Sequence, residues 1–184
     1  MHLRKKYIPL LFRWSAFLSM FLIFSLIMAF PLAEQNFLRA DGLMALGLMD
    51  QAAEHYNRAL LLAPRFDQAY SMLAWIYELR HDDKRAAAVY EKGIARHSGD
   101  EMIFLHYIVF LWKMGDNDKA LEVCRHAYAD FPEVSTVQRV YANALEKAGR
   151  DREAIEIWKK FAEDHPGDPS VREKLRKREG KGGL

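Results

Sequence analysis

Small and apolar residues recur in this chain at a fixed interval of 34 positions, and no insertion or deletion interrupts the spacing. Each interval holds an alanine, a residue suited to a turn, and a proline or serine that closes the unit. The recurring residues are Ala52, Ala86, Ala120 and Ala154; Gly47, His81, Gly115 and Gly149; and Pro64, Ser98, Pro132 and Pro166. A period of about 34 residues is typical of stacked helix–turn–helix units.

Each unit is predicted to contain two helices joined at the glycine position. The alanine lets the second helix approach the first closely, and the proline ends that helix because it lacks an N–H group. Near the starts of the second helices stand aspartates able to cap free N–H groups, namely Asp50, Asp82, Asp116 and Asp151. The expected helices are 34–47, 50–62, 66–80, 83–97, 100–114, 117–130, 134–148 and 151–164.

Large, small and aromatic residues occupy fixed places within each unit. In the third unit these are Phe104, Tyr107, Ile108, Leu111, Ala120, Cys124, Ala127 and Pro132. The pattern resembles the tetratricopeptide repeat family. The resemblance implies an all-α fold, a right-handed α-solenoid of about four repeats with a C-terminal capping helix. The expected repeats are 33–66, 67–100, 101–134 and 135–168, followed by the capping helix 169–178 and a disordered tail 179–184.

Four residues depart from the family pattern. Asn36 and Arg39 stand where large apolar residues are usual, so the first helix of the array is expected to be a partly polar cap. Gln138 and Phe161 replace a large apolar residue and an alanine in the fourth unit.

The N-terminal part of the chain has a different character. Residues 14–33 form an uncharged run of 20 residues, which as a helix would be roughly 30 Å long, the thickness of a bilayer's hydrocarbon core. The basic segment 1–13 precedes it. The positive-inside rule therefore predicts a signal-anchor helix at 14–33 with the N-terminus in the cytoplasm and the repeats on the periplasmic side of a bacterial inner membrane.

A cleaved signal peptide is the alternative interpretation of this run. Such peptides have shorter apolar regions that end in small residues, whereas Pro31 precedes Ala33 here. The first repeat starts at the end of the run without a linker, and Pro31 is expected to kink the junction. This placement predicts partners that are membrane-bound or close to the membrane.

Charge and chemistry restrict the function classes. Residues 34–166 contain 17 Lys and Arg against 22 Asp and Glu, a mildly acidic balance that argues against nucleic-acid binding. No sequence motif of a hydrolase, metalloprotease or nucleotide-binding site is present. Cys124 is the single cysteine and is expected in the core. We therefore predict no catalytic residue, no metal, no cofactor and no small-molecule substrate.

The first helices are the candidate binding surface. In tetratricopeptide repeats their second, fifth, ninth and twelfth positions line the inner face, and the resemblance implies a groove here. Its predicted residues are Phe37, Met44, Trp75, Met102, Leu105, Val109, Trp112, Arg139 and Asn143. The segment 102–112 is apolar on all sides and must be covered, either by a partner or internally by the array and its capping helix.

These observations lead to two functional hypotheses. The first is a non-enzymatic, membrane-anchored scaffold or assembly factor that holds a protein partner in the groove. The alternative is an accessory subunit of a stable membrane complex, held through its transmembrane helix by small residues such as Ser15 and Ser19.

Overall fold

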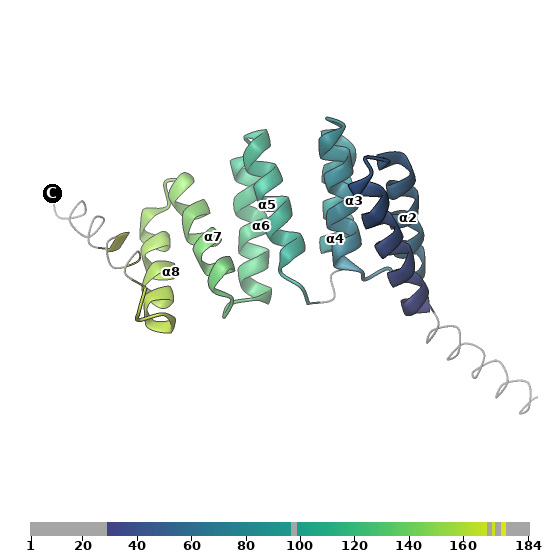
Figure 1. Cartoon of the computed structure of the whole chain (residues 1–184). Coiled ribbons are helices and arrows are strands. Elements are labelled where there is room, and N and C mark those ends of the chain that lie inside the picture. Colours follow the sequence, from purple (N-terminus) through teal and green to yellow (C-terminus); the bar gives the residue numbers. More distant parts are fainter. Residues whose placement is uncertain (1–28, 97–98, 169–170, 172–173, 176–184) are drawn as a thin grey trace, which may run out of the picture. The chain divides into compact units, whose positions relative to one another are not determined.

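The computed structural model describes residues 29–96, 99–168, 171 and 174–175, and within these ranges it contains helices and no strand (Figure 1). A helix over residues 29–45 comes first. It is followed by α2 (Met49–Leu62), α3 (Asp67–Leu79), α4 (Asp83–Ile94), α5 (Met102–Met114), α6 (Asn117–Asp130), α7 (Ser135–Lys147) and α8 (Asp151–Asp164). The chain divides within α4 into two compact units, Met1–Ala86 and Ala87–Leu184. From here on these are called the first and the second unit, and each 34-residue segment is called a repeat.

The helix bounds agree with those expected from the 34-residue pattern to within a few residues, except at the N-terminal end. There the chain is already helical at residue 29, and this helix runs through Pro31 instead of starting near residue 34.

The alanine that recurs in every second helix allows the two helices of a pair to pack closely. All four recurring alanines are fully buried, and the tyrosine, cysteine or tryptophan one turn later is buried beside them. The alanines are Ala52, Ala86, Ala120 and Ala154, and the larger partners are Tyr56, Tyr90, Cys124 and Trp158.

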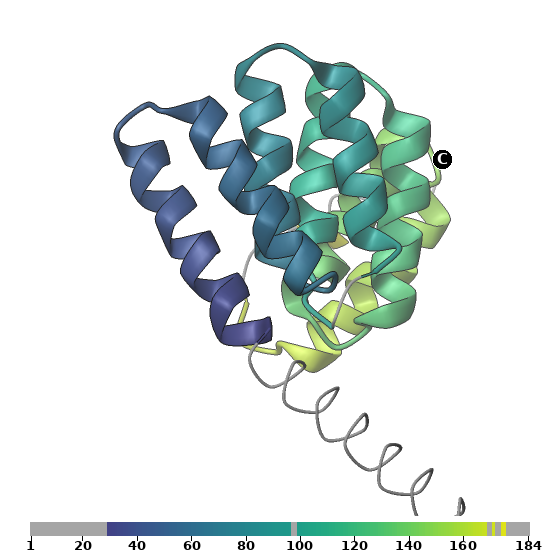
Figure 2. The same cartoon turned by 90° about the vertical axis from the view of Figure 1, so that its right-hand side faces the viewer.

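In the first unit, the helix over residues 29–45 lies antiparallel to α2 (Figure 2). Phe37 packs its ring 5.5 Å from Tyr56 and 4.8 Å from Phe66. The Tyr56 hydroxyl donates to Asp41, and burial raises the pKa of Tyr56 well above its ordinary value. An aromatic cluster therefore holds the first helix to the rest of this unit.

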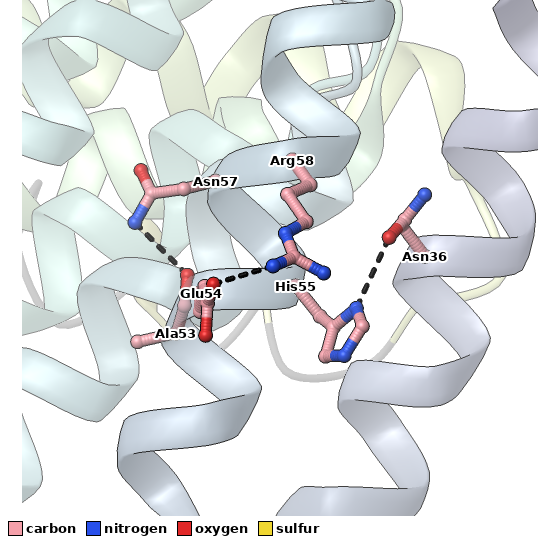
Figure 3. Close-up of polar contacts among 6 residues, drawn as sticks. All are labelled: Asn36, Ala53, Glu54, His55, Asn57 and Arg58. Atoms are coloured by element: carbon pink, nitrogen blue, oxygen red, sulfur yellow. Dashed lines mark hydrogen bonds and ion pairs between the residues drawn. The ribbon is translucent and has the colours of Figure 1, made fainter.

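Asn36, one of the departures from the family pattern, has a polar partner. Its Oδ1 lies 3.0 Å from Nδ1 of His55 on α2, as Figure 3 shows. Its amide nitrogen donates to the carbonyl of Leu32 at 2.8 Å. Both residues are half-buried, so a hydrogen bond takes the place of the usual apolar contact.

In the second unit, aromatic rings and an ionic contact join α4, α5 and α6. The ring of Tyr107 lies 5.2 Å from that of Tyr90 and 6.2 Å from that of Phe110. The Tyr107 hydroxyl donates to Glu91 at 3.0 Å, and Lys119 also donates to this carboxylate. The hydrogen bond from Lys119 holds the pKa of Glu91 below its usual range, and burial raises the pKa of Tyr107 to about 12.

Gln138, a second departure, is fully buried within the second unit. Its amide nitrogen donates to the carbonyl of Pro132 at 2.7 Å and to Oδ2 of Asp164 at 2.8 Å. These bonds tie the start of α7 to the loop before it and to the end of α8. The loop and the helix end supply acceptors for the buried amide nitrogen, while Oε1 of Gln138 has no hydrogen-bond donor among the described residues.

The four turns between first and second helices share one hydrogen-bonding pattern, in which a backbone N–H bonds the carbonyl five residues earlier. The pairs are Leu48 to Leu43 at 2.9 Å, Asp82 to Tyr77 at 2.9 Å, Asp116 to Leu111 at 3.0 Å and Arg150 to Leu145 at 2.9 Å. The residue before each donor has a positive φ: 73° at Gly47, 56° at His81, 78° at Gly115 and 71° at Gly149. This is the Schellman arrangement, for which glycine is the usual residue.

The aspartate caps are confirmed at two of the four predicted positions. Asp116 accepts from the N–H of Lys119 at 3.1 Å, and Asp82 accepts from the N–H of Arg85 at 3.0 Å. Asp50 and Asp151 lie within the first turns of α2 and α8 and are not the caps, since Leu48 and Arg150 hold those positions without a side-chain hydrogen bond. Asp50 and Asp151 therefore stand near the helix starts, as predicted, but do not cap them.

The predicted capping helix 169–178 is described at three positions. Val171, Lys174 and Leu175 are helical, and the side chain of Val171 is fully buried. The rest of the predicted helix and the predicted tail 179–184 lie outside the described residues.

We predict that His81→Gly stabilises the protein by about 1 kcal/mol, because a side chain at positive φ strains the backbone. Equilibrium unfolding of the full chain in urea, in mild detergent, measures this change. Gly115→Ala is the opposing control, since a Cβ there meets no atom within 4 Å and only the backbone conformation is penalised. A lower unfolding midpoint for His81→Gly would contradict the prediction.

A second prediction concerns the missing cap at α2. Leu48→Asp should stabilise the protein by about 1 kcal/mol, because its carboxylate can accept from free N–H groups at the helix start. Leu48 is 42% exposed, so only part of a leucine's apolar burial is lost. Asp116→Ala should have the opposite effect of similar size in the same urea titration. Equal stability of Leu48→Asp and the parent protein would show that the cap does not form.

Candidate functional site

α3 exposes a stripe of side chains at the second, ninth and thirteenth repeat positions, and α5 exposes the same stripe together with the sixth position. On α5 this stripe is Met102, His106, Val109 and Lys113, all exposed. Spacings of four, three and four residues place such side chains on one face of a helix. The predicted groove residues came from the fifth and twelfth repeat positions instead of the sixth and thirteenth. On α5 the fifth and twelfth positions are less exposed than the sixth and thirteenth.

On α5 the predicted residues separate into two pairs. Met102 and Val109 are 43% and 48% exposed, whereas Leu105 is buried. Trp112 is half-buried, with Nζ of Lys147 4.6 Å from its ring centroid. Its buried Nε1 has no hydrogen-bond acceptor among the described residues. Internal packing therefore accounts for Leu105 and much of Trp112, and the surface available to a ligand lies at Met102 and Val109.

The polar part of the predicted site lies on α7. Arg139 is exposed, whereas Asn143 is half-buried and its Oδ1 accepts from Nζ of Lys174 at 2.8 Å. The same ammonium group lies 4.1 Å from the ring centroid of Trp158. The C-terminal residues thus cover part of the α7 face.

In the first unit, the predicted residues again differ in exposure. Trp75 on α3 is exposed, while Phe37 and Met44 are half-buried, Phe37 within the aromatic cluster. Sequence reasoning missed Leu79, which is exposed four residues after Trp75 on the same stripe. The spacing of the pair could have identified it.

The exposed charged residues of α5 and α7, the first helices in the second unit, share one sign. Among the charged residues of α5 and α7, the exposed ones are Lys113, Arg139 and Lys147, and all are basic. The single acid of these two helices, Glu146, is half-buried and accepts from Nε1 of Trp158 at 2.8 Å. The apolar stripe of α5 is therefore accompanied by positive charge.

The described residues contain no group of three or more His, Cys, Asp or Glu side chains arranged to hold a metal ion. His106 is exposed on the α5 stripe. A hollow of about 150 Å³ on α6 and α7 is lined by charges of both signs, including Asp118, Arg125 and Arg150.

Within the part of the chain that the structure describes, no helix is both long enough and apolar enough to cross a membrane. The predicted span 14–33 falls mainly outside that part, which includes its last five residues. The basic segment 1–13 also lies outside it.

Repeated helix pairs, closed by the same turn at a 34-residue spacing, define a helical-repeat protein. Models of the tetratricopeptide repeat match residues 37–101 and 111–177. The chain therefore contains tetratricopeptide repeats over these ranges, as the spacing and the recurring residues predicted.

Solved structures of similar fold come from several proteins. The structure from a functional characterisation of Pseudomonas aeruginosa pilF matches with a TM-score of 0.61 and 22% identity, over 82% of this chain and 71% of that one. YrrB, described as a TPR protein with an unusual peptide-binding site, matches with a TM-score of 0.56 and 20% identity, over 74% of this chain and 70% of that one. MamA from Desulfovibrio magneticus matches with a TM-score of 0.57 and 15% identity, over 78% of this chain and 81% of that one.

Sequence comparison with curated proteins finds no significant match. The similar structures are less than 25% identical to this chain, so they support the fold. Tetratricopeptide repeats generally act as modules that bind protein partners.

Cys124 is predicted to be unreactive in the folded protein. It is buried, and burial raises the pKa of its thiol to about 12, so little of the nucleophilic thiolate is present at mildly alkaline pH. Reaction with Ellman's reagent should be slow and should accelerate on adding denaturant. Ala129→Cys, an exposed position on the same helix, is the reactive control. Equal native rates for the two thiols would contradict the burial of Cys124.

Proposed function

We propose that this chain is a non-enzymatic, membrane-anchored scaffold or assembly factor that holds a segment of a partner protein. The contact surface is formed by the exposed side chains of α5 and α7 in the second unit. The uncharged run 14–33 and the basic residues before it support an anchor in a bacterial inner membrane. The N-terminus is then cytoplasmic and the repeats are periplasmic. Partners in the membrane or close to it fit this location.

The observation that carries the proposal is the exposed apolar pair Met102 and Val109. They lie on a helix whose other apolar residues, except Met114 and the half-buried Trp112, are buried. Apolar side chains grouped on one exposed stripe are typical of interfaces. Methionine also adapts its shape to different apolar partners.

The accompanying basic residues indicate the chemistry of the partner. Lys113, Arg139 and Lys147 favour a segment that combines an apolar stripe with acidic residues. An amphipathic helix of that kind has the shape to lie along α5. YrrB, one of the structural neighbours, is described as having a peptide-binding site, which is consistent with peptide recognition on this fold.

Site-specific photo-crosslinking in native membranes tests the proposal. A photoreactive residue at Val109 should give a discrete adduct that mass spectrometry identifies, because this side chain lies on the proposed contact surface. The same residue at Arg125, exposed on α6, should give no such adduct. Equal labelling from both positions would mean that no defined surface is used.

A matched pair of variants then tests the contact itself. Val109→Glu should abolish the adduct partner's co-purification, because it places a carboxylate in an apolar contact. Ala129→Glu adds the same charge to α6 and should leave co-purification intact. Co-purification that survives Val109→Glu would favour the alternative function, a complex subunit held through residues 14–33.

A further inference from the structure

One end of the first unit is apolar and exposed. Phe30 and Leu32, at the start of the described helix, are 58% and 48% exposed, and Leu61, near the end of α2, is 82% exposed. Arg65 follows in the exposed loop between α2 and α3. Large apolar side chains grouped in this way indicate a covering surface outside the unit.

Contacts place these residues at the same end of the helix pair. The ring centroid of Phe30 lies 6.0 Å from that of Phe66, the residue just before α3. Since the helix over residues 29–45 and α2 are antiparallel (Figure 2), the end of α2 lies beside the start of that helix. The end with Phe30, Leu32, Leu61, Arg65 and Phe66 is called the N-terminal corner below.

The sequence before the corner indicates what covers it. Phe30 and Leu32 belong to the uncharged run 14–33, which is long enough to cross the hydrocarbon core. If the run spans a bilayer, its last residues lie at the boundary between hydrocarbon and headgroups. The contact between Phe30 and Phe66 then brings the loop between α2 and α3 to the same depth.

We propose that the N-terminal corner is inserted in the lipid–water interface of the membrane, with Leu61 and Phe30 at the acyl boundary and Arg65 at the level of the lipid phosphates. Apolar side chains beside a basic residue are suited to that region. The inference rests on the proposed anchor. It goes beyond the anchor because it states which residues of the first unit contact the membrane.

Depth-dependent fluorescence quenching tests the inference on the full chain reconstituted in vesicles of phosphatidylethanolamine and phosphatidylglycerol. A fluorophore is attached to Leu61→Cys in a Cys124→Ala background, and lipids carry a doxyl quencher either close to the headgroup or deep in the acyl chain. Leu46→Cys is the matched control, because Leu46 is also a leucine, is 74% exposed and lies in the turn before α2, at the opposite end of that helix from Leu61. Leu22→Cys, inside the uncharged run, reports on the anchor.

The expected result is loss of most fluorescence at Leu61 with the quencher near the headgroup, loss of most fluorescence at Leu22 with the quencher deep in the acyl chain, and no loss at Leu46 with either. Quenching at Leu22 alone would overturn the insertion of the corner and leave the anchor standing. No quenching at Leu22 would overturn the anchor and the corner together. Equal quenching at Leu61 and Leu46 would mean that the unit lies along the surface. A blue-shifted Leu61 probe without quenching would mean that protein, and not lipid, covers the corner.

Discussion

Each helix pair in this chain depends on the close contact made at one alanine of its second helix. The four alanines are fully buried, and any larger side chain there would separate the paired helices. The aromatic residue or cysteine one turn later then fills the space beside the contact. The left-handed residue in the preceding turn brings the second helix back along the first, so the turn and the alanine act together in every repeat.

Most of the fold could be predicted from the sequence because its determinants are local and repeated. A shared period specifies the helix bounds, the turns and the buried positions without reference to distant residues. The exposures of Leu105 and Trp112 could not be predicted in this way. They depend on neighbouring helices, and Lys147 lies over Trp112 from a position 35 residues further along the chain. Gln138 is similar, since Asp164 and Pro132 supply its acceptors.

The candidate site illustrates the same limit. The family pattern indicates which helices face a ligand, but the side chains available on them are set by packing against the next repeat and the C-terminal residues. The apolar character of α5 was evident in the sequence, and its separation into a buried majority and the exposed residues Met102, Val109 and Met114 required the structure. The basic character of the face emerges when the half-buried Glu146 is distinguished from the exposed lysines.

The contacts of Lys174 have a consequence for how such a protein can change its length. Repeat arrays grow in evolution by duplication of whole units, and a new unit must stack on the exposed end of the last one. Here Lys174 lies over Trp158 and bonds Asn143, and Val171 is buried. An added repeat would have to reproduce these three contacts, so duplication is more easily accepted inside the array than at its C-terminal end.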